Sequence, residues 1–258
     1  DYHQTAEMDL SQIRRQKGFT LDELDSSTAA ILDKQVPSAK QLAKLSGSLA
    51  SDARALGMSA EDTADTFHKT AFELRMSDRS IKAMVAGTLR IAKNQSVSAK
   101  HVSEIRKSLE ETFKTMTSMG KLTSASQNVM TENALIAEKF GVRDLQDETM
   151  QTYSSREGFM QGAEKFGPQF GMINAELMKT GKYNFTDLYD GSIASSAEGQ
   201  RDIMKAQTAS YELLLGQLEG IQDQSQKNFI VNNMTGGRVK SEFQLNNVIR
   251  ASKLSSMT

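Results

Sequence analysis

The feature that most constrains the fold is a serine-led unit that recurs between residues 38 and 140. The units start at Ser38, Ser59, Ser77 and Ser98, which are separated by 21, 18 and 21 positions. One helix of about four to five turns plus a connection occupies this many residues. A serine hydroxyl can accept a hydrogen bond from a free N–H of the first turn, so each serine predicts a helix start. The spacing therefore predicts a helical array.

Each unit carries apolar residues at steps of three and four. Such stripes predict amphipathic helices whose apolar faces pack against other helices. The sequence leaves open whether a given stripe faces the core of the chain or a seam with another chain. The residues that we expect to carry this packing are Leu42, Leu45, Leu49, Phe67, Leu74, Val102, Ile105, Leu109 and Phe113.

Two helix ends in this region share a glycine followed by an apolar residue. These are Gly57-Met58 and Gly141-Val142. Glycine adopts the left-handed conformation that closes a helix, so we expect a helix to end at each pair. Ser59 and Asp144 are then expected to cap the helices that follow.

Residues 157–192 depart from the array because glycines and aromatic rings alternate there. This density of turn residues favours a compact connector between helical segments. Three interpretations stay open: the rings form a small local core, they form a contact patch for another chain, or the segment acts at a membrane. The candidate interaction residues are Phe159, Phe166, Phe170, Tyr183, Phe185 and Tyr189.

Composition agrees with a helical fold. The chain has 258 residues, only 2 prolines, no tryptophan and 6 % aromatic residues, a composition that favours helix over sheet. The hydrophobic share of 38 % suits thin helical layers, so we expect an extended shape or one completed by partner chains. The 14 methionines are either gap fillers in the core or part of an adaptable oligomer seam.

We therefore predict an all-α fold, an elongated helical array or bundle of about eight helices with a connector rich in glycine and aromatic residues. Four segments are expected: short N-terminal helices, the helical array, the connector and C-terminal helices, at residues 1–36, 37–156, 157–195 and 196–258. Because the chain begins at Asp1, we expect it to be a processed product or the ordered part of a longer protein.

Charge and motifs exclude several classes of function. A net charge of -1 provides no overall field that attracts nucleic acid or an anionic membrane. The absence of cysteine excludes disulfides and thiolate metal sites. His3, His68 and His101 lie too far apart in sequence for a zinc motif, and no apolar run reaches the roughly 18 residues that span a bilayer. We predict no catalytic residues, no metal site, no cofactor and no small-molecule substrate.

One helix junction reads Ala55-Leu56-Gly57-Met58-Ser59-Ala60-Glu61-Asp62. Similar stretches occur at 92–99 and 137–142, and a run of similar character lies at 84–93. These helix junctions resemble those of bacteriophage tail tape-measure proteins, and the resemblance covers about residues 38–156. The resemblance implies a helical, oligomeric protein of the virion that fills the tail tube, sets its length and leaves ahead of the DNA. Its implied partners are copies of itself and other virion proteins of the tail tube, baseplate or portal region.

Three alternatives remain. A capsid-internal ejection protein is similar in composition. A cell-wall hydrolase carried in the virion would use Glu157 or Glu164, beside the aromatic segment, as its acid. A bacterial secretion or signalling module of helical type is the third alternative.

Overall fold

All regular structure in the described residues is helical. The computed structural model has fourteen α-helices, numbered α2 to α15, one short 3-10 helix, η2, and no strand in that part of the chain. This confirms the all-α prediction, whereas the expected number of about eight helices is too low. The described residues are 12, 14–15, 17–34, 39–68, 78–118 and 122–258.

The helix number was underestimated because two predicted elements are subdivided. The single helix expected after Ser98 is interrupted at Leu109, where no glycine or proline marks a break. The expected connector at 157–195 is itself largely helical. Several short helices therefore occupy segments in which the sequence predicts one longer element. The spacing of apolar residues alone does not reveal where each helix is interrupted.

The chain divides into two compact units, residues 1–107 and 108–258. The expected segment boundaries after residues 36, 156 and 195 do not coincide with this division, and they stay predictions. The helices of the first unit are α2 (Leu21–Lys34), α3 (Ala39–Leu56), α4 (Ala60–His68), α5 (Asp78–Gln95) and α6 (Ala99–Ser108), the last residue of which begins the second unit.

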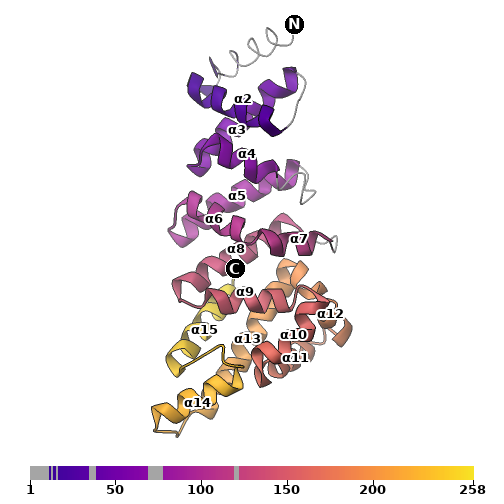
Figure 1. Cartoon of the computed structure of the whole chain (residues 1–258), viewed down its shortest axis with the longest axis vertical. Coiled ribbons are helices and arrows are strands. Elements are labelled where there is room, and N and C mark those ends of the chain that lie inside the picture. The colour runs from indigo at the N-terminus through magenta and orange to yellow at the C-terminus, as the bar shows by residue number, and fades with distance from the viewer. Residues whose placement is uncertain (1–11, 13, 16, 35–38, 69–77, 119–121) are drawn as a thin grey trace. The chain divides into compact units, whose positions relative to one another are not determined.

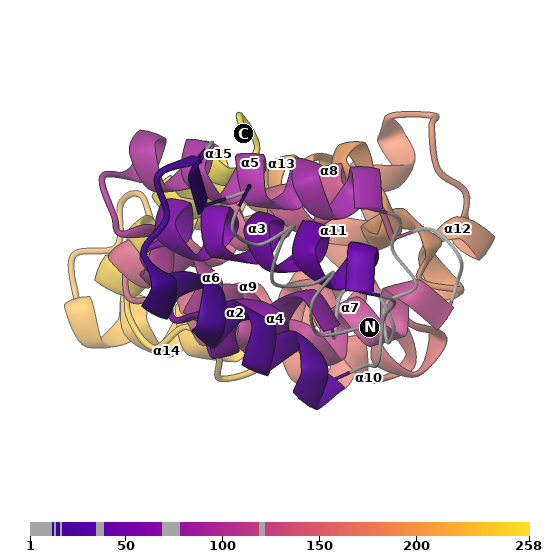
Figure 2. The same cartoon turned by 90° about the horizontal axis from the view of Figure 1, so that it is seen from above.

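In the first unit, α2 packs against both α3 and α4, and α3 also contacts α4 and α5. Figure 2 shows α2 running alongside α4, with α3 next to them. Phe19, Leu24 and Ala50 form a buried cluster among these helices. This cluster packs Phe19, which precedes α2, and Leu24 of α2 against Ala50 of α3.

The second unit is organised around its longest helix, α13. This helix packs against α8, α11 and α15, and in Figure 1 it lies between α11 and α15. The helices of the unit are α7 (Glu110–Ser118), α8 (Ser124–Lys139), α9 (Arg143–Thr152), α10 (Arg156–Phe166), α11 (Pro168–Lys179), α12 (Phe185–Tyr189), η2 (Ser192–Ser195), α13 (Ala197–Gln217), α14 (Gln224–Met234) and α15 (Glu242–Ser255).

The apolar stripes that the structure describes are buried in the chain itself. Each of these side chains is at most 4 % exposed, which places them in the core. They are Leu49, Val102, Ile105, Leu109 and Phe113. The structure describes the backbone but not the side chains of three other predicted stripe residues, Leu42, Leu45 and Phe67. The fourth, Leu74, lies outside the described residues.

Four helices end in the same backbone motif, at residues 53–58, 92–97, 137–142 and 232–237. In each, the N–H of the sixth residue donates to the carbonyl of the first, and the N–H of the fifth donates to the carbonyl of the second. This pair of bonds satisfies carbonyls that a helix end leaves free. The bonds from the sixth residue to the first measure 3.0 Å from Met58 to Ala53, 3.0 Å from Val97 to Ala92, 2.9 Å from Val142 to Ala137 and 2.8 Å from Gly237 to Asn232.

The fifth residue of each motif is left-handed. Gly57 has φ 64° and Gly141 has φ 67°, as the sequence predicts, whereas Ser96 takes the same position with φ 54°. In the first three motifs, three residues separate the helix from the next: α3 from α4, α5 from α6, and α8 from α9. The fourth motif ends α14 with Gly236 at φ 60°, and seven residues lie between α14 and α15. The junction with a three-residue connection therefore occurs three times, once without its glycine.

The predicted caps agree with the structure in part. Ser59 accepts from the N–H of Asp62 at 3.0 Å, and Ser98 accepts from the N–H of His101 at 3.1 Å. Asp144 does not cap α9, because the helix already begins at Arg143 and its N-cap is Val142. Asp144 lies in the first turn, where a carboxylate still interacts favourably with the helix dipole. The starts at Ser38 and Ser77 lie outside the described residues.

Candidate interaction surface

Five aromatic rings of the second unit form one connected cluster. Phe159 on α10 is at its centre, with ring centroids 5.0 Å from Phe170, 5.7 Å from Phe185 and 6.0 Å from Tyr189. Tyr153 contacts both Phe159 and Phe170. All four contacts of the Phe159 ring are edge-on, the arrangement that aromatic quadrupoles favour, and each such pair contributes about 0.5–1.5 kcal/mol.

The cluster extends from the core to the surface. Tyr153, Phe159 and Phe170 are buried, whereas Phe185 is 60 % exposed. Tyr189 is partly exposed and stacks on Phe185, with the centroids 5.9 Å apart and the rings 16° from parallel. The buried rings hold the exposed pair in place, so little conformational freedom remains for a partner to remove.

Two glycines allow the elements of this region to approach closely. A Cβ on Gly162 would lie 2.3 Å from the ring of Phe170, so a larger residue would displace that ring. Gly191 has φ 75°, and its Cβ would lie 2.3 Å from the backbone nitrogen of Ser155. The glycines of the segment therefore serve close packing between helices and not only turns.

Arg156 and Met160 complete the exposed part of the cluster. The Arg156 guanidinium lies 4.8 Å from the centre of the Tyr189 ring, and its Nε donates to the Tyr189 hydroxyl. That hydroxyl donates in turn to the sulfur of Met160 at 3.9 Å, and Met160 is 65 % exposed. We call Arg156, Met160, Phe185 and Tyr189 together the aromatic surface.

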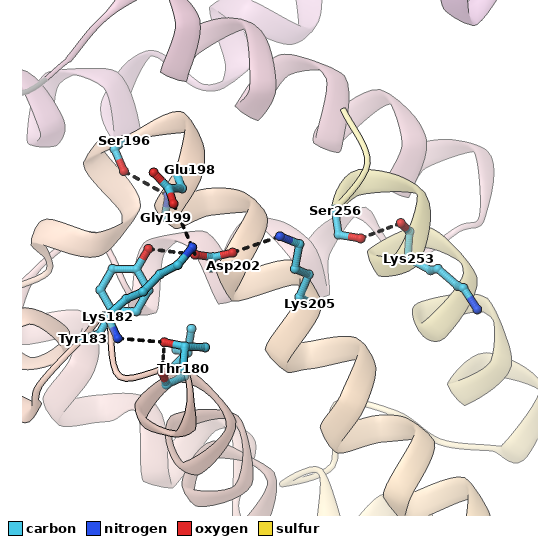
Figure 3. Close-up of polar contacts among 11 residues, drawn as sticks. Thr180, Lys182, Tyr183, Ser196, Glu198, Gly199, Asp202, Lys205, Lys253 and Ser256 are labelled. Atoms are coloured by element: carbon cyan, nitrogen blue, oxygen red, sulfur yellow. Dashed lines mark hydrogen bonds and ion pairs between the residues drawn. The ribbon is translucent and has the colours of Figure 1, made fainter.

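The segment before α12 is tied to α13 by a polar cluster around Asp202 (Figure 3). Lys182 donates to one carboxylate oxygen of Asp202 at 3.1 Å, and the Tyr183 hydroxyl donates to the same oxygen at 3.0 Å. Lys205 donates to the other oxygen at 3.1 Å, and Lys182 also reaches Glu198 at 2.8 Å. Residues 182–183 are thereby fixed, and with them the start of α12.

These contacts change the protonation equilibria of the groups involved. Burial disfavours the charged form of Asp202, but the donors Lys182, Lys205 and Tyr183 outweigh it and hold the pKa of this carboxyl below its usual range. Burial and the bond to Asp202 raise the pKa of Tyr183, while the bonds to Glu198 and Asp202 raise the pKa of Lys182. The cluster thus keeps its charges around neutral pH.

α12 is also fixed at its own N-terminus. The side chain of Asn184 accepts from the N–H groups of Thr186 and Asp187, at 2.8 and 3.1 Å, and Asp187 accepts from the N–H of Asn184 at 2.9 Å. Such reciprocal capping stabilises a helix too short to persist alone. One consequence is that Phe185 and Tyr189, four residues apart, point to the same side.

The six predicted interaction residues have three different environments. Phe159, Phe170, Phe185 and Tyr189 come together in the cluster. Phe166 is buried at the end of α10, and Tyr183 belongs to the polar cluster. Phe159, Phe166 and Phe170 are therefore part of a local core, which is one of the interpretations that the sequence left open. A role in contacts with another chain stays a prediction.

Sequence reasoning did not place Tyr153, Arg156 and Met160 in this site. The spacing of Arg156 and Met160, four residues apart like Phe185 and Tyr189, is the signal that could have indicated a shared face.

The residues weighed for other functions lie apart from any enclosed site. Glu157 and Glu164 are both exposed on α10. In the part of the chain that the structure describes, no three His, Asp or Glu side chains are grouped as metal ligands, and no helix is long and apolar enough to cross a bilayer. The chain matches no protein-family model, no curated protein and no solved structure.

Proposed function

We propose that this chain is a structural protein of a bacteriophage particle, a tape-measure-like helical segment of the tail interior that takes part in tail assembly and genome ejection. The observation that carries the proposal is the thrice-repeated junction at residues 53–58, 92–97 and 137–142. Each of these stretches overlaps a segment whose sequence resembles the helix junctions of tape-measure proteins. The recurrence of the same bonds and of a three-residue connection at all three stretches supports the proposal.

The spacing of the junctions also supports the proposal. Their first residues, Ala53, Ala92 and Ala137, are 39 and 45 positions apart. A chain built from such recurring helix pairs is lengthened or shortened by whole units, each of which contacts mainly its neighbours. Modular construction of this kind suits a protein that sets a length by its own extent.

The aromatic surface is the contact site that we assign to partner chains, either copies of this chain or other virion proteins. Exposed Phe185 and Met160 offer apolar area whose removal from water favours docking, at about 25 cal/mol for each Å² buried. Aromatic residues, Met and Arg are the types enriched in protein interfaces, and all three are present here. Because packed neighbours hold the stacked pair, docking costs little ordering.

Immunogold labelling of purified particles that carry the parent gene tests the proposal. We expect antibodies against this chain to label tails that have been opened by mild denaturant. Label confined to the capsid interior would contradict the proposal in favour of an ejection protein. Particles without the chain would contradict both. Peptidoglycan zymography of the purified chain, with Glu157→Gln and Glu164→Gln as controls, tests the hydrolase alternative, and clearing that either substitution abolishes would overturn a purely structural role.

A further inference from the structure

α15 has two apolar faces, and the chain covers only one of them. The inner face is buried and includes Leu245, Val248 and Ile249. On the outer face Phe243 is 76 % exposed, Leu254 is 47 % exposed, and Met257, in the turn that follows the helix, is 70 % exposed. Large apolar side chains at such exposure along one helix indicate a surface for another protein segment.

The outer face has the spacing of a helix-pairing seam. Positions 243, 247, 250, 254 and 257 follow steps of four and three residues, the average of about 3.5 that keeps a stripe facing a partner helix. Arg250 lies in the middle of this stripe, and Lys253 lies beside it; both are exposed. The outer face of α15 is therefore apolar toward its ends and positive in its centre.

The positive centre disfavours pairing of this face with itself. In a parallel pair in register, Arg250 would lie next to its own copy. In an antiparallel pair centred on the stripe, Arg250 would again face Arg250. Because like charges at an interface cost several kcal/mol, the outer face requires a partner with carboxylates.

The first unit offers an acidic groove of about 670 Å³ between α2, α3 and the start of α4. This volume lies in the range of about 300–1,000 Å³ that is typical of ligand sites. Carboxylates of Asp22, Glu23 and Glu61 line it, with Met58 among the apolar groups. Small side chains form the rest of the apolar lining, namely Ala29, Ala30, Ala50, Ala53 and Ala60.

The only guanidinium among the groove's lining residues is already engaged. Arg54 binds both carboxylate oxygens of Glu23, at 2.9 and 2.6 Å. These bonds, together with one from the N–H of Thr20, hold the pKa of Glu23 at about 2. The described lining residues carry three carboxylates and one guanidinium, so the net charge of the groove is negative. Asp22 and Glu61 are both exposed.

We propose that the outer face of α15 in one copy of the chain docks in this groove of a second copy. Leu254 and Met257 would lie on the alanine lining, and Arg250 and Lys253 would meet Asp22 and Glu61. Both surfaces have apolar parts, and their charges are opposite in sign. Because they are different surfaces, the contact is head-to-tail, and it extends into a filament unless the rotation closes a ring. The inference does not depend on the assignment to a phage particle.

Sedimentation equilibrium of the full chain with reciprocal charge swaps tests this contact. We expect the wild type to associate through the micromolar range, and more weakly at high salt, because the screening length falls from about 10 Å at 0.1 M to about 3 Å at 1 M. Arg250→Glu with Lys253→Glu, and separately Asp22→Lys with Glu61→Lys, should each weaken association at least about tenfold. An equimolar mixture of the two variants should associate again, since opposite charges then face each other.

The control for the α15 swap is Lys93→Glu with Lys240→Glu, which makes the same change in net charge as that swap at exposed sites outside the two surfaces. Circular dichroism establishes that each variant remains helical, and Arg250→Gln with Lys253→Gln provides a milder pair if a swap unfolds the chain. A wild type that stays monomeric, swaps that leave association unchanged, or a mixture of folded variants that stays dissociated would each overturn the proposal. A monomeric wild type would leave the phage assignment untouched, because labelling of tails tests that separately.

Discussion

Replacing Ser96 by glycine should stabilise the chain, although it removes a side chain. Ser96 is exposed and has φ 54°, the left-handed conformation that glycine takes at the two equivalent junctions. For a residue with a Cβ, this left-handed conformation costs roughly 1–2 kcal/mol of conformational free energy. Glycine avoids that cost but loses roughly 0.5–1 kcal/mol more backbone entropy on folding. The balance predicts that Ser96→Gly raises the free energy of unfolding by about 0.5–1 kcal/mol.

The reverse substitution, Gly141→Ser, should destabilise by a similar amount. A Cβ at Gly141 would meet nothing within 4 Å, so the change tests the backbone conformation and not packing. Gly216→Ala is the matched control, because Gly216 lies inside α13, is also open to solvent and has no positive φ. There, replacing glycine should stabilise by about 0.5–1 kcal/mol.

Urea unfolding followed by far-ultraviolet circular dichroism measures all three changes as shifts in midpoint at an unchanged slope. The reasoning requires Ser96→Gly to raise the urea midpoint and Gly141→Ser to lower it. It is refuted if Ser96→Gly is neutral or destabilising while Gly216→Ala behaves as expected. In that case the second junction would not share the backbone of the other two in solution.

Three further predictions concern the aromatic surface and the first unit. Phe185→Ala should leave the urea midpoint nearly unchanged but reduce binding to partner chains in a pull-down assay, whereas Phe229→Ala, at an exposed site of 68 % on α14, should leave binding intact. Phe159→Ala, at the buried centre of the cluster, should cost about 3–5 kcal/mol of unfolding free energy; a loss below about 1 kcal/mol would contradict the packing described. Glu23, with its pKa lowered to about 2 beside Arg54, stabilises the first unit above its ordinary pKa. This contribution should be lost as the pH falls from about 4.5 toward 2. In thermal unfolding across this pH range, the melting temperature of Glu23→Gln should therefore fall less with pH than that of the wild type.

Local signals in the sequence predicted the helical class and several helix ends. Ser59 and Ser98 accept the expected capping bonds, and Gly57 and Gly141 have the expected left-handed backbone. Each of these depends on a few neighbouring residues, which is why a pattern can reveal it. Ser96 was missed as a left-handed residue because serine seldom adopts that conformation.

The arrangement of the aromatic surface depends on contacts between residues that are distant in sequence. Phe185 is exposed because the chain before it is tied to Asp202, which lies on another helix. Phe159 is buried because the rings around it come from α11 and α12. The density of glycines and aromatic residues indicated that this segment differs from the helical array. Tertiary packing decides which ring is buried and which is exposed.

Electron microscopy of tail lengths tests the central claim, that recurring helix units make this chain a length-setting structural protein. Deleting residues 54–92 joins Ala53 to Lys93 and removes one repeat while keeping the junction in register. Deletion of residues 54–92 removes 39 residues, which would measure about 60 Å as one straight helix at about 1.5 Å per residue. Because α3 packs against both α4 and α5, the account predicts tails shorter by a uniform step of less than about 60 Å. Intact tails of unchanged length, from particles that contain the shortened chain, would contradict it.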